Sequence, residues 1–178
     1  MNETVEVILK RRSVRNFENK MISEEELKTI IDCGLFAPSA KNRQNWHFTV
    51  ITNKERIDEI SNAALKGMNK LGLDKDPEFH IFYNAPLVIV ISSKIEGYSE
   101  INAGCVVQNM ALAAKSMNIG SCIIGQTRYI YHKFPKLEGN RLLKIPEGYE
   151  HDVSICFGYI KKDTDPKPRK ENVVDYIL

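Results

Sequence analysis

The sequence lacks several patterns that would assign it at once to a functional class. None of its apolar runs approaches the roughly 20 residues that a helix needs to cross a bilayer. Its four cysteines form no CxxC pair and its four histidines are scattered, so we predict no metal site. The glycine-rich signatures GxGxxG and GxxxxGK[ST] are both absent, which excludes dinucleotide or triphosphate binding by those routes.

An excess of charge of either sign is missing too. The formal net charge is only +2 over 178 residues, so we expect no general attraction to nucleic acid or to an acidic membrane. The first six residues are acidic and lack the basic start and apolar stretch of a signal peptide, which predicts a cytoplasmic location. An apolar content of 43% and a charged content of 27% are typical of a globular protein. The length fits one domain, residues 1–178.

Local patterns predict helices and strands that do not alternate strictly, which favours an α+β or three-layer sandwich around a mixed sheet. Helices are expected over residues 3–10, 24–35, 54–70 and 99–117, with shorter ones within 129–144. Strands are expected over residues 47–52, 86–92, 121–124 and 153–159. Ser23 and Glu26 form a capping box that begins the second helix, and Pro38 ends it.

Four of these segments carry further expectations. The first helix should turn Val5, Ile8 and Leu9 inward. The unbroken apolar strand at 86–92 should be buried on both faces. The helix at 99–117, capped by Ser99 and apolar nearly all round, should form the buried spine of the protein or of a dimer. The apolar end of the tail, residues 173–178, could add a strand to a sheet edge in this subunit or its partner.

The first segment that could form a binding site is Arg11-Arg12-Ser13-Val14-Arg15, directly after the first expected helix. Guanidinium groups are always charged, and their planar fork of donors fits phosphate. The plainer interpretation is solvated surface charge. A second basic stretch, around Lys167 and Arg169 in the tail, allows the same two interpretations.

The second segment is Pro38-Ser39-Ala40-Lys41-Asn42-Arg43-Gln44-Asn45-Trp46. Amide side chains both donate and accept hydrogen bonds, so they can read the edge of a heterocycle. The plainer interpretation is a polar loop that ends a helix. Taken together, the two segments indicate a site for a phosphorylated ring cofactor.

With these two segments in this order, the chain resembles the FMN-dependent nitroreductase family. The resemblance extends through Asn102-Ala103-Gly104, Gln108–Ala114, Gly120–Gly125, Phe157-Gly158-Tyr159 and Lys167–Lys170, and so covers nearly the whole chain. It implies a three-layer α/β/α sandwich with a mixed, mainly antiparallel sheet. It also implies a homodimer with FMN at the interface, where the tail from about residue 161 could pack on the partner.

The resemblance also implies roles for individual residues. It assigns cofactor binding to Arg11, Arg12, Ser13, Arg15, Pro38, Ser39, Ala40, Asn42, Gln44, Ile124, Gly125, Lys167 and Arg169. Arg15 would face the N1–C2=O edge of the flavin, and a backbone N–H near Gly125 or Gln126 would face N5. Residues 38–44 would come from the other subunit. The sequence departs from the family at Asn45, where Pro is usual, at Asn102, where Asp is common, and at Gly125-Gln126.

The implied activity is transfer of electrons from NADH or NADPH through FMN to nitroaromatics, quinones or other flat acceptors, by a ping-pong mechanism and without a catalytic side chain. Three alternatives stay open. One is a specialised flavin reductase or reductive dehalogenase of the same family. Another is a flavin protein for storage or redox sensing. The third is a basic module that binds nucleic acid, against which the balanced charge argues.

Overall fold

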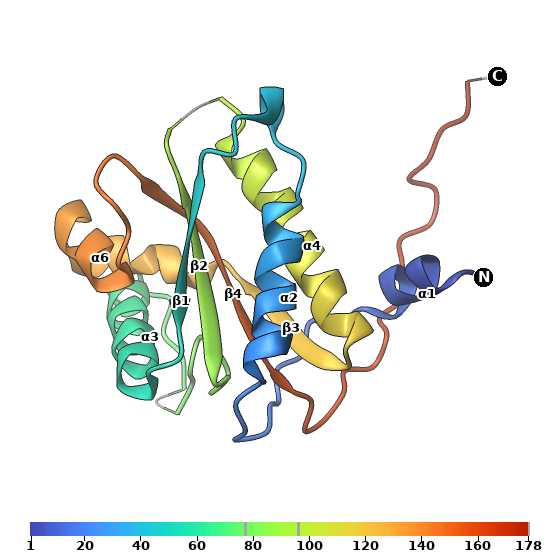
Figure 1. The fold of residues 1–178 in the computed structure, drawn as a ribbon. Helices are drawn as coiled ribbons and strands as arrows, with labels where there is room; N and C mark the ends of the chain where they lie inside the picture. Colours follow the sequence, from blue (N-terminus) through green and yellow to red (C-terminus); the bar gives the residue numbers. More distant parts are fainter. Residues whose placement is uncertain (77, 96, 178) are drawn as a thin grey trace.

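The computed structural model describes residues 1–76, 78–95 and 97–177 as three layers, with a central sheet between two layers of helices (Figure 1). The strands are β1 (Trp46–Ile51), β2 (Leu87–Ser93), β3 (Ile119–Ile124) and β4 (Glu150–Tyr159). They lie in the order β1-β2-β4-β3, and every neighbouring pair is antiparallel. The one parallel contact described is an isolated bridge between Ser13 and Ser121 on β3. This confirms the expected three-layer fold and its mainly antiparallel sheet.

Strand β2 lies at the centre of the molecule, and all seven of its residues are buried. Its side chains alternate between the two faces of the sheet, because successive residues of a strand point in opposite directions. Leu87, Ile89 and Ile91 join one hydrophobic core, while Val88 and Val90 join the other. The prediction that this strand is covered on both faces is therefore confirmed.

Helices α2 (Glu24–Leu35) and α4 (Ser99–Ser116) cover one face of the sheet. Helix α2 begins at the expected capping box, in which the Ser23 and Glu26 side chains each bond the other's backbone N–H. Helix α4 is the predicted spine, with nine of its residues buried. Its expected cap is wrong, since Ser99 is already the first helical residue and its hydroxyl donates to the Lys94 carbonyl at 2.8 Å.

The other face of the sheet is covered by α3 (Lys54–Asn69), the 3₁₀ turn η2 (Gln126–Tyr129), α5 (Ile130–Lys133) and α6 (Lys136–Leu143). Helix α3 packs closely on η2 at Gly67. A Cβ at this position would overlap the backbone carbonyl oxygen of Tyr129. This close approach requires glycine, although glycine weakens a helix elsewhere.

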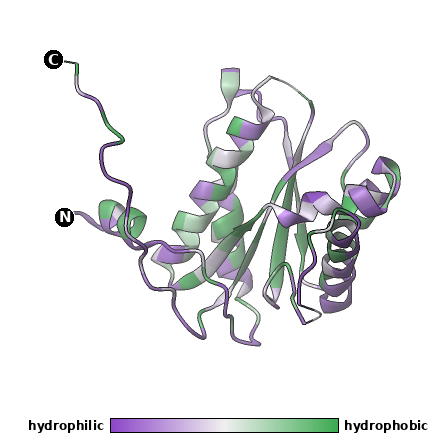
Figure 2. Cartoon of the chain, turned by 180° about the vertical axis from the view of Figure 1, so that it is seen from behind, coloured by the Kyte–Doolittle hydropathy of each residue, from purple (hydrophilic) through white to green (hydrophobic). Residues whose placement is uncertain are grey.

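Helix α1 (Glu3–Lys10) and the C-terminal tail lie at the outside of the three layers, side by side in both views (Figures 1 and 2). The expected burial of the α1 apolar face is wrong within one chain, because Val5, Ile8 and Leu9 are 40%, 47% and 56% exposed. The apolar residues at 173–177 are also exposed, and over 161–177 the tail adds no strand to the sheet. Leu178 lies outside the described residues. Both surfaces are exposed in the described chain.

The four cysteines differ in burial. Cys122 and Cys156 are buried and face one another across β3 and β4, whereas Cys33 and Cys105 are half-buried. All four are free thiols. Across the described ranges, the structure has no helix with the length and apolar character to span a membrane.

The contact at Gly67 gives a test of the packing between α3 and η2. We expect Gly67→Ala to lower the free energy of unfolding by about 2 kcal/mol or more, because the backbone of Tyr129 must move to admit the methyl group. Urea unfolding measures this change. Lys66→Ala, an exposed neighbour on the same helix, should stay within about 0.5 kcal/mol of the parent. Equal stability of the two variants would contradict the packing described.

Candidate cofactor site

The arginine segment is held on the outer edge of the sheet. After α1 the chain runs beside β3, where the Val14 N–H donates to the Ser121 carbonyl at 2.9 Å. The Val14 side chain is buried in the core. Alternation along this extended segment leaves the flanking side chains, Ser13 and Arg15, on the opposite side from Val14.

The C-terminal tail returns to the same edge. Thr164 Oγ1 donates to the Ser13 carbonyl at 3.1 Å, and the Lys161 N–H donates to the Asn16 carbonyl at 3.1 Å. These bonds place the tail over the arginine segment. Together they enclose a cavity of about 190 Å³ lined by Arg11, Arg12, Ser13, Arg15, Thr164, Asp165, Lys167 and Arg169. The structure thus brings together the six basic and hydroxyl residues that the sequence singled out at the two ends of the chain.

This cavity carries an unbalanced positive charge. Five basic side chains and one carboxylate line it, and within the described residues none of the five forms an ion pair. Arg12 Nε is buried without a hydrogen-bond partner, an arrangement that costs free energy unless an acceptor is supplied. A cavity of this kind attracts a multiply charged anion and can satisfy it with several donors.

Arg15 has a partner that the sequence did not reveal. Its Nε donates to the Tyr83 hydroxyl at 3.3 Å, and its guanidinium carbon lies 5.7 Å from the centroid of the Tyr83 ring. The hydrogen bond raises the pKa of Arg15 above its ordinary value. Tyr83 itself has a left-handed backbone, with φ of 55°, which is unusual for an aromatic residue. Tyr83 therefore fixes the position of the Arg15 head group.

The second predicted segment forms a compact loop with a short 3₁₀ turn, η1 (Ala40–Asn42). Three of its non-glycine residues, Lys41, Asn42 and Gln44, have φ between 47° and 55°. Gln44 N–H donates to Ser39 Oγ at 3.1 Å, and its side-chain amide donates to Asn42 Oδ1 at 3.0 Å. Several left-handed residues in one loop indicate a functional segment, because each costs stability. Pro38 precedes the loop and is exposed.

Two of the departures from the family pattern, Asn45 and Asn102, meet beneath this loop. Asn102 Oδ1 accepts from the Ala40 N–H at 3.1 Å, and Asn102 Nδ2 donates to Asn45 Oδ1 at 3.5 Å. Asn45 Nδ2 donates in turn to the Lys94 carbonyl. A carboxylate at position 102 could not donate to Asn45. The two asparagines are therefore complementary, and their hydrogen bonds restrain the loop where a proline ring is missing.

Within one chain, the loop and the arginine cavity are far apart. The loop is anchored to Asn102, near the start of α4, whereas α1 packs beside Leu112, Ala113 and Ser116, near its end. These two places are about 20 Å apart along the helix axis. Figure 1 shows the same separation, with η1 at the top and α1 at the right. A single subunit therefore does not bring the two predicted segments into one site.

The third predicted segment follows β3. Ile124 is buried, Gly125 is exposed, and Gln126 is half-buried at the start of η2. Gly125 and Gln126 line a second cavity of about 590 Å³, whose opposite wall is formed by residues 72–75. The edge of β3 runs from the arginine cavity at Ser121 to Gly125, about 13 Å for four residues. This is a length along which a phosphorylated ring compound can lie.

The sequence missed Tyr83, Thr164 and Asp165 among the residues around this site. Tyr83 bonds Arg15 across 68 residues, and Thr164 bonds Ser13 across 151. No local pattern marks either of them. The sequence offered one clue to Thr164 and Asp165, which is that they lie two to five residues before Lys167 and Arg169, the basic pair of the tail.

Comparison with known proteins agrees with this geometry. A sequence model of the nitroreductase family matches residues 8–159. The chain is similar to a nitroreductase with bound FMN from Desulfitobacterium hafniense, with 30% identity, a TM-score of 0.90 and full coverage of both chains. It is similar to an FMN-bound nitroreductase from Bacteroides fragilis, with 25% identity, a TM-score of 0.90 and full coverage of both chains.

Among curated proteins, it is 30% identical to an FMN reductase (NADPH) of Bacillus subtilis, over 95% of this chain and 70% of the relative. The family match spans most of the chain, and the fold agrees with that of both solved structures. The chain belongs to the nitroreductase family.

Proposed function

We propose that this protein is an NAD(P)H-dependent FMN oxidoreductase. The observation that carries the proposal is the arginine cavity, where five basic side chains from the two ends of the chain have no paired carboxylate among the described residues. The terminal phosphate of FMN supplies the charge that this cavity needs. Arg11, Arg12, Ser13, Lys167 and Arg169 would hold it, with Arg12 Nε gaining the acceptor that it lacks.

The edge of β3 would then direct the rest of the cofactor. Arg15, fixed by Tyr83, would face the N1–C2=O edge of the ring, where a cation can stabilise negative charge. The backbone at Ile124, Gly125 and Gln126 would border N5, and the exposed Gly125 permits a close approach. When bound, FMN would supply the redox chemistry, since its ring can take hydride from NADH or NADPH and pass electrons to a second substrate. No side chain has to act as acid, base or nucleophile.

The complete site would need a second subunit. The loop of Pro38, Ser39, Ala40, Asn42 and Gln44 lies too far from its own arginine cavity to cover a cofactor there, but the loop of a partner could. The exposed apolar face of α1, an apolar groove beside Phe36 and Leu112, and the exposed tail offer the surface for such a contact. A two-fold dimer would then form two equal sites, each from both chains.

The second substrate is a flat conjugated acceptor, such as a nitroaromatic or a quinone, which takes the place of nicotinamide in a ping-pong sequence. The similarity to an FMN reductase makes free flavin a second candidate for the acceptor. The cavity beside Gly125, about 590 Å³, lies within the range of known small-molecule sites. A flavin protein for storage or sensing, without turnover, is the competing interpretation.

The freshly purified protein is expected to be yellow, with the visible spectrum of bound FMN. Anaerobic addition of NADH, and separately of NADPH, should bleach it, because the cofactor accepts hydride from the nicotinamide. Absorption near the flavin maximum measures both properties and identifies the better donor. A yellow protein that neither donor reduces would favour storage or sensing. A colourless protein that also rejects added FMN would contradict the proposal.

Tyr83→Phe tests the fixing of Arg15. The variant removes the hydrogen bond but keeps the ring, so FMN affinity should fall by about threefold to tenfold. The flavin potential should also become more negative, because the cation beside the ring is less well held. Fluorescence titration of the apoprotein and a redox titration measure the two effects. Tyr98→Phe, at an exposed tyrosine that does not line this cavity, is the control, and an identical response of both variants would refute the role of Tyr83.

Complementation tests the shared site. Arg11→Ala/Arg15→Ala and Ser39→Ala/Asn42→Ala should each be inactive alone, since each removes one half of every site. After subunit exchange, equal amounts of the two should form heterodimers that hold one intact site each. About one quarter of the parent activity should therefore return. If mass spectrometry detects heterodimers but no activity returns, both segments of each site must come from the same chain, which contradicts the shared site.

A further inference from the structure

The turn that carries Tyr83 has an unusual backbone, and a histidine lies at its start. The Tyr83 N–H donates to the His80 carbonyl at 2.8 Å, which closes the turn just before β2. Tyr83 and Asn84 both have left-handed backbones, with φ of 55° and 56°. This conformation is costly for an aromatic residue, so the turn depends on further bonds that hold it.

The imidazole of His80 supplies two such bonds. Its Nδ1 accepts from the Phe82 N–H at 3.2 Å and from the Asn84 N–H at 3.3 Å. The two donors lie on either side of Tyr83 in the chain, so the ring braces the turn around that residue. The buried side chains of Ile81 and Phe82 anchor the same turn in the core.

Acceptance at Nδ1 fixes where the proton of His80 lies. A ring nitrogen that accepts hydrogen bonds carries no proton, so the neutral ring is protonated at Nε2. Nε2 lies 3.3 Å from Asp58 Oδ1 on α3, although it forms no hydrogen bond with the described residues. The carboxylate favours a proton on the nitrogen that faces it, which leaves Nδ1 free to accept.

The surroundings of His80 favour the uncharged ring. Its side chain is only 13% exposed, and burial lowers its pKa below the ordinary value of 6.5. Among the described residues, the charged groups that face it are Asp58, which opposes this shift, and Lys54, which adds to it. Protonation of Nδ1 at lower pH would set an N–H against the two backbone donors and break both bonds.

The turn affects the proposed cofactor site because Tyr83 reaches Arg15. The Tyr83 hydroxyl accepts from Arg15 Nε, and the guanidinium lies over the Tyr83 ring. A shift of the backbone at Tyr83 moves this ring and so removes the fixed partner of Arg15. His80 itself does not line the arginine cavity, so we expect its effect on a ligand there to pass through Tyr83.

We propose that His80 is a positioning residue for Arg15, which acts by bracing the turn of Tyr83, and that a proton on Nδ1 releases this turn. The protonated protein should then hold FMN less tightly. The consequence for FMN rests on the proposed function, whereas the bracing of the turn does not.

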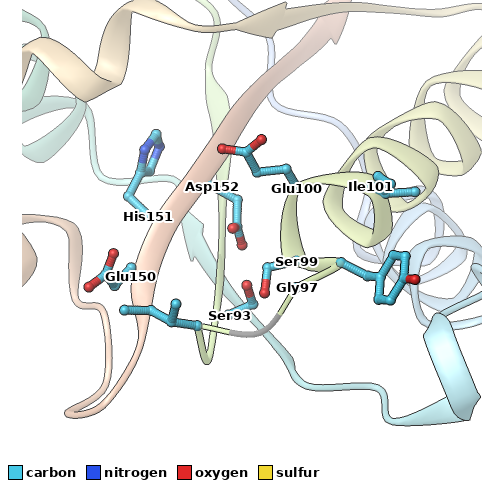
Figure 3. Close-up of a pocket in the computed structure, with 10 residues that line it drawn as sticks. Ser93, Gly97, Ser99, Glu100, Ile101, Glu150, His151 and Asp152 are labelled. Carbon is cyan, nitrogen blue, oxygen red and sulfur yellow. The ribbon is translucent and has the colours of Figure 1, made fainter.

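A second histidine of low pKa is distinguished by its pH range. His151 lines a polar cavity of about 360 Å³ at the end of β2, the start of β4 and the first turn of α4, together with Glu100, Glu150 and Asp152 (Figure 3). Burial lowers the pKa of His151 to about 4. The ring of His151 therefore stays largely uncharged above about pH 5, so a change between pH values of about 5 and 7.5 is not due to it.

Amide hydrogen exchange in the apoprotein tests the turn without FMN. In His80→Ala, the amides of Phe82 and Asn84 should exchange at least about tenfold faster than in the parent, because both lose their acceptor. In His80→Asn, the Phe82 amide should stay close to the parent, because an asparagine side chain can accept from the N–H two residues on. His47→Asn, at an exposed residue of β1 on the opposite edge of the sheet, is the control.

FMN affinity as a function of pH tests the link to the cofactor. From about pH 7.5 to about pH 5, the parent should lose affinity more steeply than His80→Asn, whose side chain does not titrate. The phosphate of FMN also gains a proton near about pH 6, but equally for both proteins. At about pH 7.5, His80→Ala should bind FMN about threefold to tenfold more weakly. Adding Tyr83→Phe should weaken binding no further, because both act through one contact.

Three results would overturn the proposal. One is unchanged exchange at Phe82 and Asn84 in His80→Ala, whether or not the protein binds FMN. Another is the same pH profile of FMN affinity in the parent and in His80→Asn. The third is additive losses of affinity in the double variant. Should His80→Ala fail to fold, the two pH profiles decide. A parent that binds no FMN would contradict the proposed function alone, and hydrogen exchange would still decide the role of His80.

Discussion

The site depends on the way the chain uses the free edge of β3. In the order β1-β2-β4-β3, the described residues form no further strand beside this edge, and an open edge has backbone groups available for pairing. Here Val14 pairs with Ser121, and Thr164 then binds the Ser13 carbonyl. One strand edge therefore gathers basic side chains from the two ends of the chain. The rigid core behind it fixes where they lie.

Uneven distribution of charge is the second constraint. The net charge of the chain is only +2, yet five basic side chains gather in one cavity and three carboxylates in another. Within the described residues none of the five basic side chains forms an ion pair, so an anionic ligand would offset their charge. A small net charge thus excludes a general attraction to polyanions while leaving local clusters of opposite sign.

Local sequence was enough to predict much of this fold. Ser23 and Glu26 lie three residues apart, and the unbroken apolar run from Leu87 to Ile91 can be covered only on both faces. Contacts between distant residues could not be predicted in the same way. Tyr83 meets Arg15 because the turn before β2 folds back toward β3, and no spacing in the sequence records this. The face of α1 was misjudged because periodicity shows that Val5, Ile8 and Leu9 share a side, but not which chain covers it.

The central claim is that the arginine cavity receives the phosphate of FMN. Titration of the apoprotein with FMN and with riboflavin, which has the ring but no phosphate, tests it most directly. The account predicts that FMN binds at least about a hundredfold more tightly, since several charge-assisted hydrogen bonds are lost with the phosphate. It also predicts that Arg11→Ala/Lys167→Ala removes most of this preference. Equal affinity of the parent protein for the two flavins would contradict the account.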